Sequence, residues 1–385
     1  MNTTEAFIYL CACAATGAKA KLDSAPFDEL WQLAQAHNLT ALVAKALQDT
    51  EAFAAADTAE QKRWTNALNN NIKKTMLFEA ERKKLVRFFE ENGIWYAPLK
   101  GVIINTLFPA FGTREFADND ILIDPERTGD AKSWMLSHGY TFRTDDFSSD
   151  EYSKAPFYNF EIHRALIEES TQFETSVNYY RHVKDRLVKD GDNGFGYHFT
   201  DDDFYVFFIF HAFKHYDNRG TGFRTLADEY VILNAKRFRF DFAAIEKELV
   251  KLGILEFEQN LRALSDRLFS QPEAIEGILD TLSDEQREML QYILSCGTFG
   301  SFDNLFAKAF AQSGNGKPPS KVKYYWKRVF PEISRFKYSN PFIYRHKVLY
   351  PFFLIYRMVV NPIRHKKDLK REIRTVKRLN HTDQS

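Results

Sequence analysis

Apolar residues in the first hundred positions follow the 3.6-residue period of α-helices. Between residues 27 and 47 they recur three and four positions apart, and they do so again over the longer span 66–92. Asn92-Gly93 ends the second pattern, because glycine readily takes the left-handed conformation that closes a helix. The pattern therefore predicts a helical N-terminal segment, with one helix over 27–47 and a longer one over 66–92.

From residue 94 the pattern changes to short runs rich in apolar and aromatic residues, separated by amphipathic segments. The short runs predict strands, and the amphipathic segments predict helices. Pro125 and Gly139 frame one of these helices, with proline in its first turn and glycine at its end. This alternation predicts an α+β fold, in which helices cover a small mixed sheet. The predicted strands are 94–99, 118–124, 140–143 and 157–165, and the predicted helices are 101–108 and 125–138.

Helical periodicity returns at residue 201 and continues to residue 269. The predicted helices are 201–216, 225–236, 242–252 and 256–269. The run Gly-Asn-Gly-Lys-Pro-Pro at 314–319 is typical of a linker, because glycine and proline interrupt regular structure. These changes in pattern predict four parts, namely an N-terminal helical segment (1–92), a core that contains the sheet (93–200), a helical domain (201–313) and a basic C-terminal helical region (320–385).

The composition is that of a globular protein, with 44% hydrophobic and 27% charged residues. The sequence contains no run of eighteen clean apolar residues that would predict a membrane-spanning helix. The three cysteines, Cys11, Cys13 and Cys296, are an odd number, and the first two are too close for an easy mutual bridge. Reduced thiols and a first segment without the basic start of a secretory signal predict a cytoplasmic location.

The net charge is zero, but the charges are unevenly distributed. Residues 317–385 carry 18 Lys and Arg against four Asp and Glu, a net charge of +14, so residues 1–316 carry −14. Within the basic region, residues 348–360 are strongly apolar but too short to cross a bilayer. Three interpretations remain open: a helix packed on the protein with a solvated basic face, a peripheral contact with a membrane surface, or binding to nucleic-acid phosphates.

Two carboxylates lie one residue apart in the second predicted strand. Because side chains alternate between the faces of a strand, Asp118 and Asp120 are expected on the same side. Such a pair repels unless positive charge lies nearby, and hard divalent cations favour carboxylate oxygens. In the last predicted strand Glu161 and His163 share one face, and a charge in an apolar strand is costly unless it is paired or bound to metal. We therefore predict a third metal ligand at Glu161.

Lys100 and Gly101 lie where a predicted strand turns into a helix. Glycine lets the backbone approach a ligand, and the N–H groups at a helix start favour phosphate oxygens. Arg114 precedes Asp118 by four residues, and its bidentate guanidinium could reach a triphosphate. The alternative is a solvated pair of acids at a strand edge, because two aspartates at this spacing are a weak motif on their own.

His211 and His215 lie four residues apart, on one face of a predicted helix. One interpretation is a zinc site completed by Asp228, which would belong to a metal hydrolase. The other, which we favour, is a polar patch that lines a cleft, in which Asp228 orients a histidine and Arg224 adds a phosphate contact.

These motifs together resemble the uncharacterised nucleotidyltransferase family, within the DNA polymerase β-like superfamily. The residues that carry the resemblance are Leu99-Lys100-Gly101, Phe108-Pro109, Arg114, Asp118-Asn119-Asp120-Ile121-Leu122 and Glu161-Ile162-His163. It covers roughly the first 240 residues, and the motif set is fairly specific as a whole. The resemblance implies a polymerase-β-like nucleotidyltransferase core flanked by N- and C-terminal helical regions.

The sequence departs from the superfamily pattern at three places. The usual Gly-Ser turn is reduced to Gly101 followed by Val102. Ala117 replaces the Gly or Ser before the first acid, and Asn119 replaces the apolar residue between the acids. Asn119 is expected to point away from the metals, so it removes no ligand but places an amide where burial is expected.

The expected activity is transfer of a nucleoside monophosphate from an NTP to an acceptor hydroxyl by a two-metal mechanism, with Mg²⁺ (or Mn²⁺) as cofactor. The acceptor, whether a protein, a sugar, a small molecule or RNA, is left open by the sequence. The alternative is a catalytically weak nucleotide-binding module whose basic tail recruits a membrane or a polymer. The expected catalytic residues and metal ligands are Asp118, Asp120 and Glu161, the nucleotide-binding residues are Lys100, Gly101 and Arg114, and the cleft-lining residues are His163, His211, His215, Arg224 and Asp228.

Overall fold

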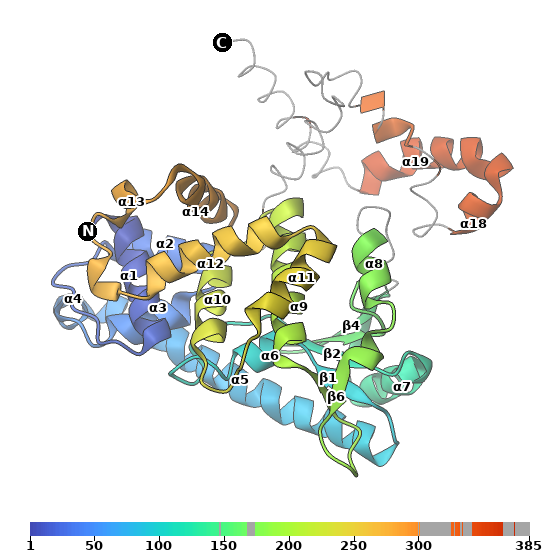
Figure 1. Cartoon of the computed structure of the whole chain (residues 1–385), viewed down its shortest axis with the longest axis horizontal. Helices are drawn as coiled ribbons and strands as arrows, with labels where there is room; N and C mark the ends of the chain where they lie inside the picture. The colour runs from blue at the N-terminus through green and yellow to red at the C-terminus, as the bar shows by residue number, and fades with distance from the viewer. Residues whose placement is uncertain are drawn as a thin grey trace.

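The structure is a computed structural model that describes most of the chain (Figure 1). The described residues are 1–145, 148–167, 174–298, 300, 325–326, 328–331, 333, 341–364 and 373. The strands are β1 (Tyr96–Pro98), β2 (Asn119–Ile123), β3 (Thr141–Asp145), β4 (Ser149–Lys154), β5 (Tyr158–His163), β6 (Leu187–Lys189) and β7 (Tyr197–Phe199).

Helices make up most of the remaining described structure. The α-helices are α1 (Thr3–Thr16), α2 (Phe27–Ala36), α3 (Thr40–Leu47), α4 (Glu51–Ala55), α5 (Thr58–Glu91), α6 (Lys100–Ile104), α7 (Thr128–Ser137), α8 (Glu174–Tyr180), α9 (Asp201–Asn218), α10 (Arg224–Asn234), α11 (Phe242–Leu252), α12 (Leu255–Phe269), α13 (Ile278–Thr281), α14 (Asp284–Cys296), α18 (Pro341–Arg345) and α19 (Tyr350–Arg364). Short 3-10 helices are η1 (Pro125–Arg127), η3 (Val183–Arg186), η4 (Pro272–Ala274) and η6 (Lys347–Leu349).

The larger sheet has the strand order β1-β2-β5-β4-β3. Its central strands β2 and β5 run parallel, whereas the other neighbouring pairs are antiparallel. A separate small sheet pairs β6 with β7. The mixed sheet with helices on its two faces confirms the predicted α+β class.

The two faces of the larger sheet have different chemistry, as strand alternation requires. On one face, Ile121 and Ile123 of β2 and Phe160 and Ile162 of β5 join a buried cluster with residues of α5 and α7. Figure 1 shows α5 running along this side of the sheet, opposite α9 and α10. The other face of β2 and β5, which carries Asp120, is therefore turned toward the helical part of the chain.

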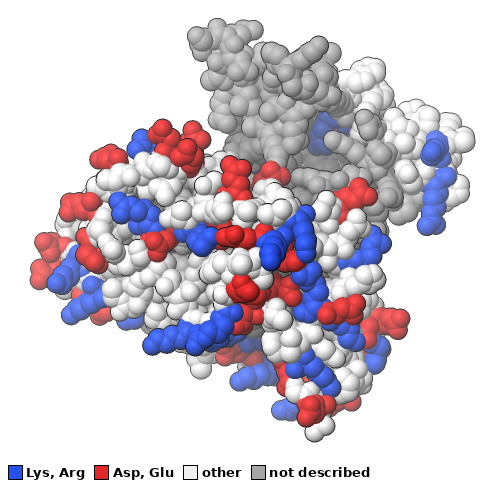
Figure 2. Space-filling view, in the orientation of Figure 1, with Lys and Arg blue, Asp and Glu red and all other residues white. Residues whose placement is uncertain are grey.

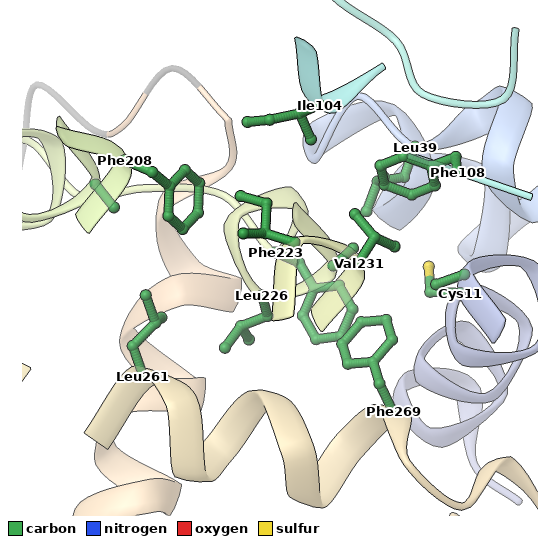
Figure 3. Close-up of a cluster of buried hydrophobic side chains, with 14 of the residues drawn as sticks. Cys11, Leu39, Ile104, Phe108, Phe208, Phe223, Leu226, Val231, Leu261 and Phe269 are labelled. Carbon is green, nitrogen blue, oxygen red and sulfur yellow. The ribbon is translucent and has the colours of Figure 1, made fainter. Parts of the chain in front are cut away.

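A second apolar core holds the N-terminal helices against the helices that follow the sheet. In Figure 3, Cys11 of α1 and Leu39 before α3 lie near Val231 of α10 and Phe269 of α12. All four side chains are buried. Residues far apart in the sequence therefore share one core, and the division into four parts stays a prediction.

The predicted helix over 27–47 is wrong in one respect, because it is two helices. α2 ends at Ala36 and α3 begins at Thr40, and Asn38 between them has the left-handed φ of 51°. The Nδ1 atom of the buried His37 accepts the backbone N–H of Phe223 at 3.1 Å. This contact with the segment before α10 is tertiary, so the periodicity of the sequence does not reveal it.

Other differences concern boundaries and short elements. α5 begins at Thr58, earlier than the predicted start at 66, because Asp57 caps it by accepting the N–H of Glu60. The helix predicted over 125–138 is η1 followed by α7, and β4, β6, β7, α8, α13 and α14 were not predicted individually. β4 is largely polar, and Tyr152 within it is fully buried. The predicted helices between 201 and 269 correspond to α9, α10, α11 and α12, and the predicted linker 314–319 lies outside the described residues.

The basic C-terminal region is described in part, through α18, η6 and α19. Among the described residues, no helix combines the length and the apolar character that crossing a membrane requires. Cys11, Cys13 and Cys296 are buried and form no disulfide.

A buried polar network lies inside the helical core. The hydroxyl of Tyr205 on α9 lies 2.5 Å from Oε1 of Glu229 on α10 and 2.8 Å from Oε1 of Glu258 on α12. Arg262 pairs with Glu258 at 2.8 Å. Because a phenol has one proton and both carboxyls contact it, the network is satisfied when one carboxyl is protonated. Burial raises the pKa of Glu229 to about 8, which identifies it as the protonated partner.

We predict that Glu229→Gln stabilises the fold at alkaline pH. The folded state favours the protonated carboxyl, so this stability is fully present below the ordinary pKa of 4.5 and is lost as pH rises through about 8. Glutamine stays neutral at every pH, so the variant keeps the stability that wild type loses, which is about a few kcal/mol. Thermal melts from pH 5 to 9 should show the variant above wild type at high pH, with the difference shrinking toward pH 5.

The control is Glu288→Gln, at an exposed position of α14. It should follow the wild-type melting temperature across the pH range. A Glu229→Gln variant that melts below wild type throughout would show that this carboxyl is ionised in the fold.

Candidate active site

The register between β2 and β5 brings the predicted acids together. Asp120 pairs with Glu161, and Leu122 pairs with His163, in a parallel arrangement. Paired positions on neighbouring strands face the same side, so the side chains of Asp120, Glu161 and His163 lie on one face. Asn119 lies on the opposite face, where its Oδ1 accepts a hydrogen bond from Arg82 of α5 at 3.0 Å. The predicted orientation of Asn119 is confirmed.

Asp120, Glu161 and His163 are close enough to share a cation. One ligand atom from each lies within 4.8 Å of the other two. Nε2 of His163 is 3.3 Å from Oδ1 of Asp120 and 3.5 Å from Oε1 of Glu161. Glu161 also accepts a hydrogen bond from the hydroxyl of Ser149 on β4, at 2.7 Å. The cluster differs from the predicted metal-ligand set, because His163 belongs to it and Asp118 does not.

Lys100, at the start of α6, supplies positive charge to the acids. Its Nζ lies 2.9 Å from Oδ2 of Asp120. Burial by itself would lower the pKa of Lys100, but the charges of Asp120, Asp118 and Glu161 raise it above its ordinary value. Lys100 is therefore a cation at neutral pH, and it offsets part of the repulsion among the carboxylates.

Asp118 and Asp120 titrate differently because they repel each other and have different partners. The charge of Asp120, followed by burial, raises the pKa of Asp118 to about 6. Burial would also raise the pKa of Asp120, but the charge of Lys100 and the contact with His163 lower it well below its usual range. Asp120 is thus the more firmly ionised member of the pair, and Asp118 is the member whose charge depends on its surroundings.

Arg114 is engaged with an acid on α10. Its Nε and Nη2 atoms donate to the two carboxylate oxygens of Asp228, at 2.7 and 2.8 Å. Both side chains are buried. The predicted bidentate contact with a triphosphate is therefore already occupied by Asp228. Nη1 of Arg114 is buried and has no hydrogen-bond partner among the described residues, and it faces Gly101, where an added Cβ would lie 3.7 Å away.

Hydrogen bonds from several elements hold the loop that carries Arg114. Asn71 of α5 donates to the carbonyl oxygens of Gly112 and Arg114, and Lys74 of α5 donates to that of Phe116 at 2.8 Å. Glu115 accepts hydrogen bonds from the hydroxyl of Thr40 at 2.5 Å and from the backbone N–H of the next residue at 2.8 Å. The loop therefore holds Arg114 in place from both α5 and α3.

Gly112 lets this loop pass close to α5. It has a φ of 73°, and an added Cβ would come within 2.7 Å of the backbone of Ile72.

Sequence reasoning missed the supporting residues Asn71, Lys74 and Ser149. Asn71 and Lys74 lie three positions apart on one side of a long predicted helix, so polar residues on its packed side were an available signal. Ser149 lies on β4, which was not predicted.

His211 and His215 contact each other on α9. Their Nε2 atoms are 3.1 Å apart, so one ring donates to the other. Burial, with the charge of Lys100, lowers the pKa of His211 well below its ordinary value and that of His215 to about 4. The ring of His215 is open to the cavity, but dense protein around it still disfavours its charged form. Both imidazoles are neutral at neutral pH.

The structure does not bring these histidines into a metal site with Asp228. Both oxygens of Asp228 accept hydrogen bonds from Arg114. Among the described residues, the group with metal-ligand spacing is the one on β2 and β5. The expectation that Asp228 orients a histidine is also not met, because its partner is the guanidinium of Arg114.

A cavity of about 260 Å³ joins these groups. The sheet side contributes Asp118, Asp120 and Glu161, and the helical side contributes Phe208 of α9 and Thr225 of α10. Every predicted site residue lines this cavity except His163, which lies behind Asp120 and Glu161. The remaining predicted site residues in its wall are Lys100, Gly101, Arg114, His211, His215, Arg224 and Asp228.

The cavity thus combines acids on one wall with cations and neutral imidazoles around them. The chain matches a family model described as uncharacterised nucleotidyltransferase over residues 23–270. Searches of curated proteins and of solved structures find no match. The matched region contains the larger sheet and every predicted site residue. Because the match covers well over half of the 385 residues, the chain belongs to the uncharacterised nucleotidyltransferase family.

Proposed function

We propose that the protein transfers a nucleoside monophosphate from an NTP to an acceptor hydroxyl. The observation that carries the proposal is the β2–β5 register, which sets Asp120 beside Glu161 on the face that forms the cavity wall. Membership of a nucleotidyltransferase family supports it. The cytoplasm supplies NTPs and keeps thiols reduced, so we place the reaction there.

The residues present fit a hard divalent cation. Asp118, Asp120 and Glu161 offer carboxylate oxygens, which Mg²⁺ and Mn²⁺ prefer to nitrogen. When bound, a pair of such ions would neutralise phosphate charge and favour in-line displacement at the α-phosphorus. We assign His163 to orienting Asp120, because its ring nitrogen lies 3.3 Å from Oδ1 of that carboxylate.

The triphosphate needs positive charge in order to approach three carboxylates. Lys100 is half-buried beside the acids and remains protonated. Nη1 of Arg114 has no hydrogen-bond partner among the described residues, and Arg224 lines the same cavity. We therefore assign the triphosphate to the side of the cavity where these cations and Gly101 meet.

In the reaction, the acceptor oxygen forms a bond with the α-phosphorus while the bond from that phosphorus to the bridging oxygen of the β-phosphate breaks. Pyrophosphate leaves with the bridging oxygen. The acceptor hydroxyl proton passes to Glu161, whose carboxylate lines the cavity and is held at 2.7 Å by Ser149. His211 and His215 are neutral, so they are suited to hydrogen bonding an uncharged acceptor in the helical half.

A second candidate is nucleotide binding with little turnover. Both oxygens of Asp120 already contact protein groups, Oδ2 with Lys100 and Oδ1 with His163. A cation must compete with these contacts, which would weaken catalysis without preventing nucleotide binding. Calorimetric binding of MgATP without pyrophosphate release would favour this candidate.

The acceptor itself can be sought by incubating the protein with labelled NTPs and whole-cell extract, and identifying the fraction that becomes labelled.

Replacing either aspartate by asparagine should abolish transfer. Asp118→Asn and Asp120→Asn keep the size of the side chain but remove the charge that a divalent cation needs. We expect pyrophosphate release to fall about a thousandfold in each variant, because metal binding supplies several kcal/mol of transition-state stabilisation.

The measurement is pyrophosphate release from NTPs with Mg²⁺ and an extract fraction that supplies the acceptor. The matched control is Asp130→Asn on α7, where the carboxylate is half-exposed and forms a surface ion pair with Arg127. Unchanged turnover in both site variants would rule out Asp118 and Asp120 as catalytic metal ligands.

Lys100→Met should weaken NTP binding. It removes the cation that lies 2.9 Å from Asp120 and leaves the carboxylates to repel the triphosphate. Removing a charge-assisted contact with a phosphate should lower the affinity for NTP about ten- to a hundredfold. Calorimetry with NTP and Mg²⁺ measures it, and Lys251→Met at an exposed position of α11 serves as the control. Equal affinity in wild type and Lys100→Met would exclude a phosphate-binding role for this lysine.

A further inference from the structure

An apolar surface is exposed on the C-terminal helices. Phe352, Ile355 and Tyr356 of α19 have exposed fractions of 68%, 57% and 52%, and Val348 in η6 just before them has 83%. On the same helix Leu354 is only 8% exposed. α19 therefore presents large apolar side chains to solvent.

These side chains form one face of the helix. Ile355 and Tyr356 follow Phe352 by three and four positions, which places them beside each other on an α-helix. Leu354 points to the other side and is buried. The face formed by Phe352, Ile355 and Tyr356 is therefore exposed, even though Leu354 on the other side of the helix is buried.

The sequence around the exposed face is basic. Residues 341–364 contain four Lys and Arg and no Asp or Glu, and the wider region 317–385 contains 18 basic residues against four acidic ones. Arg345 and Lys347, which precede α19, are both exposed. Figure 2 shows blue Lys and Arg atoms among the uncoloured side chains of α18 and α19.

We propose that α19, with Arg345 and Lys347 before it, docks the protein on the surface of an anionic lipid bilayer. The 15 residues of α19 span about 22 Å, less than the roughly 30 Å of a hydrocarbon core, so the helix lies in the interface instead of crossing it. Its apolar face enters the boundary between headgroups and acyl chains, and the surrounding cations attract anionic headgroups.

The combination of features favours a bilayer over a nucleic acid. Phosphates of a nucleic acid would engage the basic residues, but aliphatic side chains such as Ile355 and Val348 gain little from that contact. A bilayer uses both the charge and the apolar face. This docking is separate from nucleotidyl transfer and does not depend on it.

The test is co-flotation of the full-length protein with phosphatidylcholine vesicles, with and without phosphatidylglycerol. Wild type should float with the vesicles that contain phosphatidylglycerol, and binding should fall about tenfold or more without this lipid or in about 0.5 M salt. The double variant Phe352→Glu with Ile355→Glu should lower the partition coefficient about a hundredfold, because it removes two apolar side chains that the bilayer would bury. Arg345→Glu with Lys347→Glu should lower it about tenfold.

The matched control is Val250→Glu, which places the same charge at an apolar position of α11 that is 61% exposed. It should float like wild type. Far-ultraviolet circular dichroism and thermal melting, measured on every variant, establish that the fold is retained. The proposal is overturned if wild type fails to float with anionic vesicles at low salt, if the double variant floats equally well, or if an RNA oligonucleotide binds where vesicles do not.

Discussion

The parallel pairing of β2 with β5 is the constraint on which the site depends. It sets Asp120 directly beside Glu161 on the polar face of the sheet, while the opposite face is sealed by the apolar core with α5 and α7. A buried carboxylate at Asp120 and a half-buried one at Glu161 repel each other more strongly than they would in water. Lys100 and His163 contact Asp120 and offset that repulsion locally. The fold therefore carries its own counter-charges at the point where a polyphosphate and divalent cations would be needed.

The helical half of the molecule completes the site because two cores hold it in position. Residues before the sheet and residues after it share the larger core, so α9 and α10 are fixed relative to the N-terminal helices. The loop before β2 is fastened to α5 by Asn71 and Lys74, and to α3 by Glu115. These contacts place the acids on one wall of the cavity and the neutral His211 and His215 on another. The chemistry of the cavity is thus divided between two parts of the chain.

The sequence was sufficient for the features that depend on local periodicity. Alternation correctly predicted Glu161 and His163 on a common face of β5. Asp118 precedes β2, so strand alternation does not fix its orientation, although both Asp118 and Asp120 line the cavity. The sequence could not predict contacts between residues far apart in the chain. The break between α2 and α3 depends on His37 and Phe223, and the partner of Arg114 lies on α10. β4 was missed because most of its residues are polar, although Tyr152 within it is buried.

The ion pair between Arg114 and Asp228 restricts how the cavity exchanges its contents. It joins the loop before β2 to α10 through two short hydrogen bonds, and both side chains are buried. Moving the sheet away from the helical half would break both hydrogen bonds of this buried pair. A wide hinge opening is therefore disfavoured. The loop before β2 and α10 are therefore expected to move together when a molecule enters or leaves the cavity.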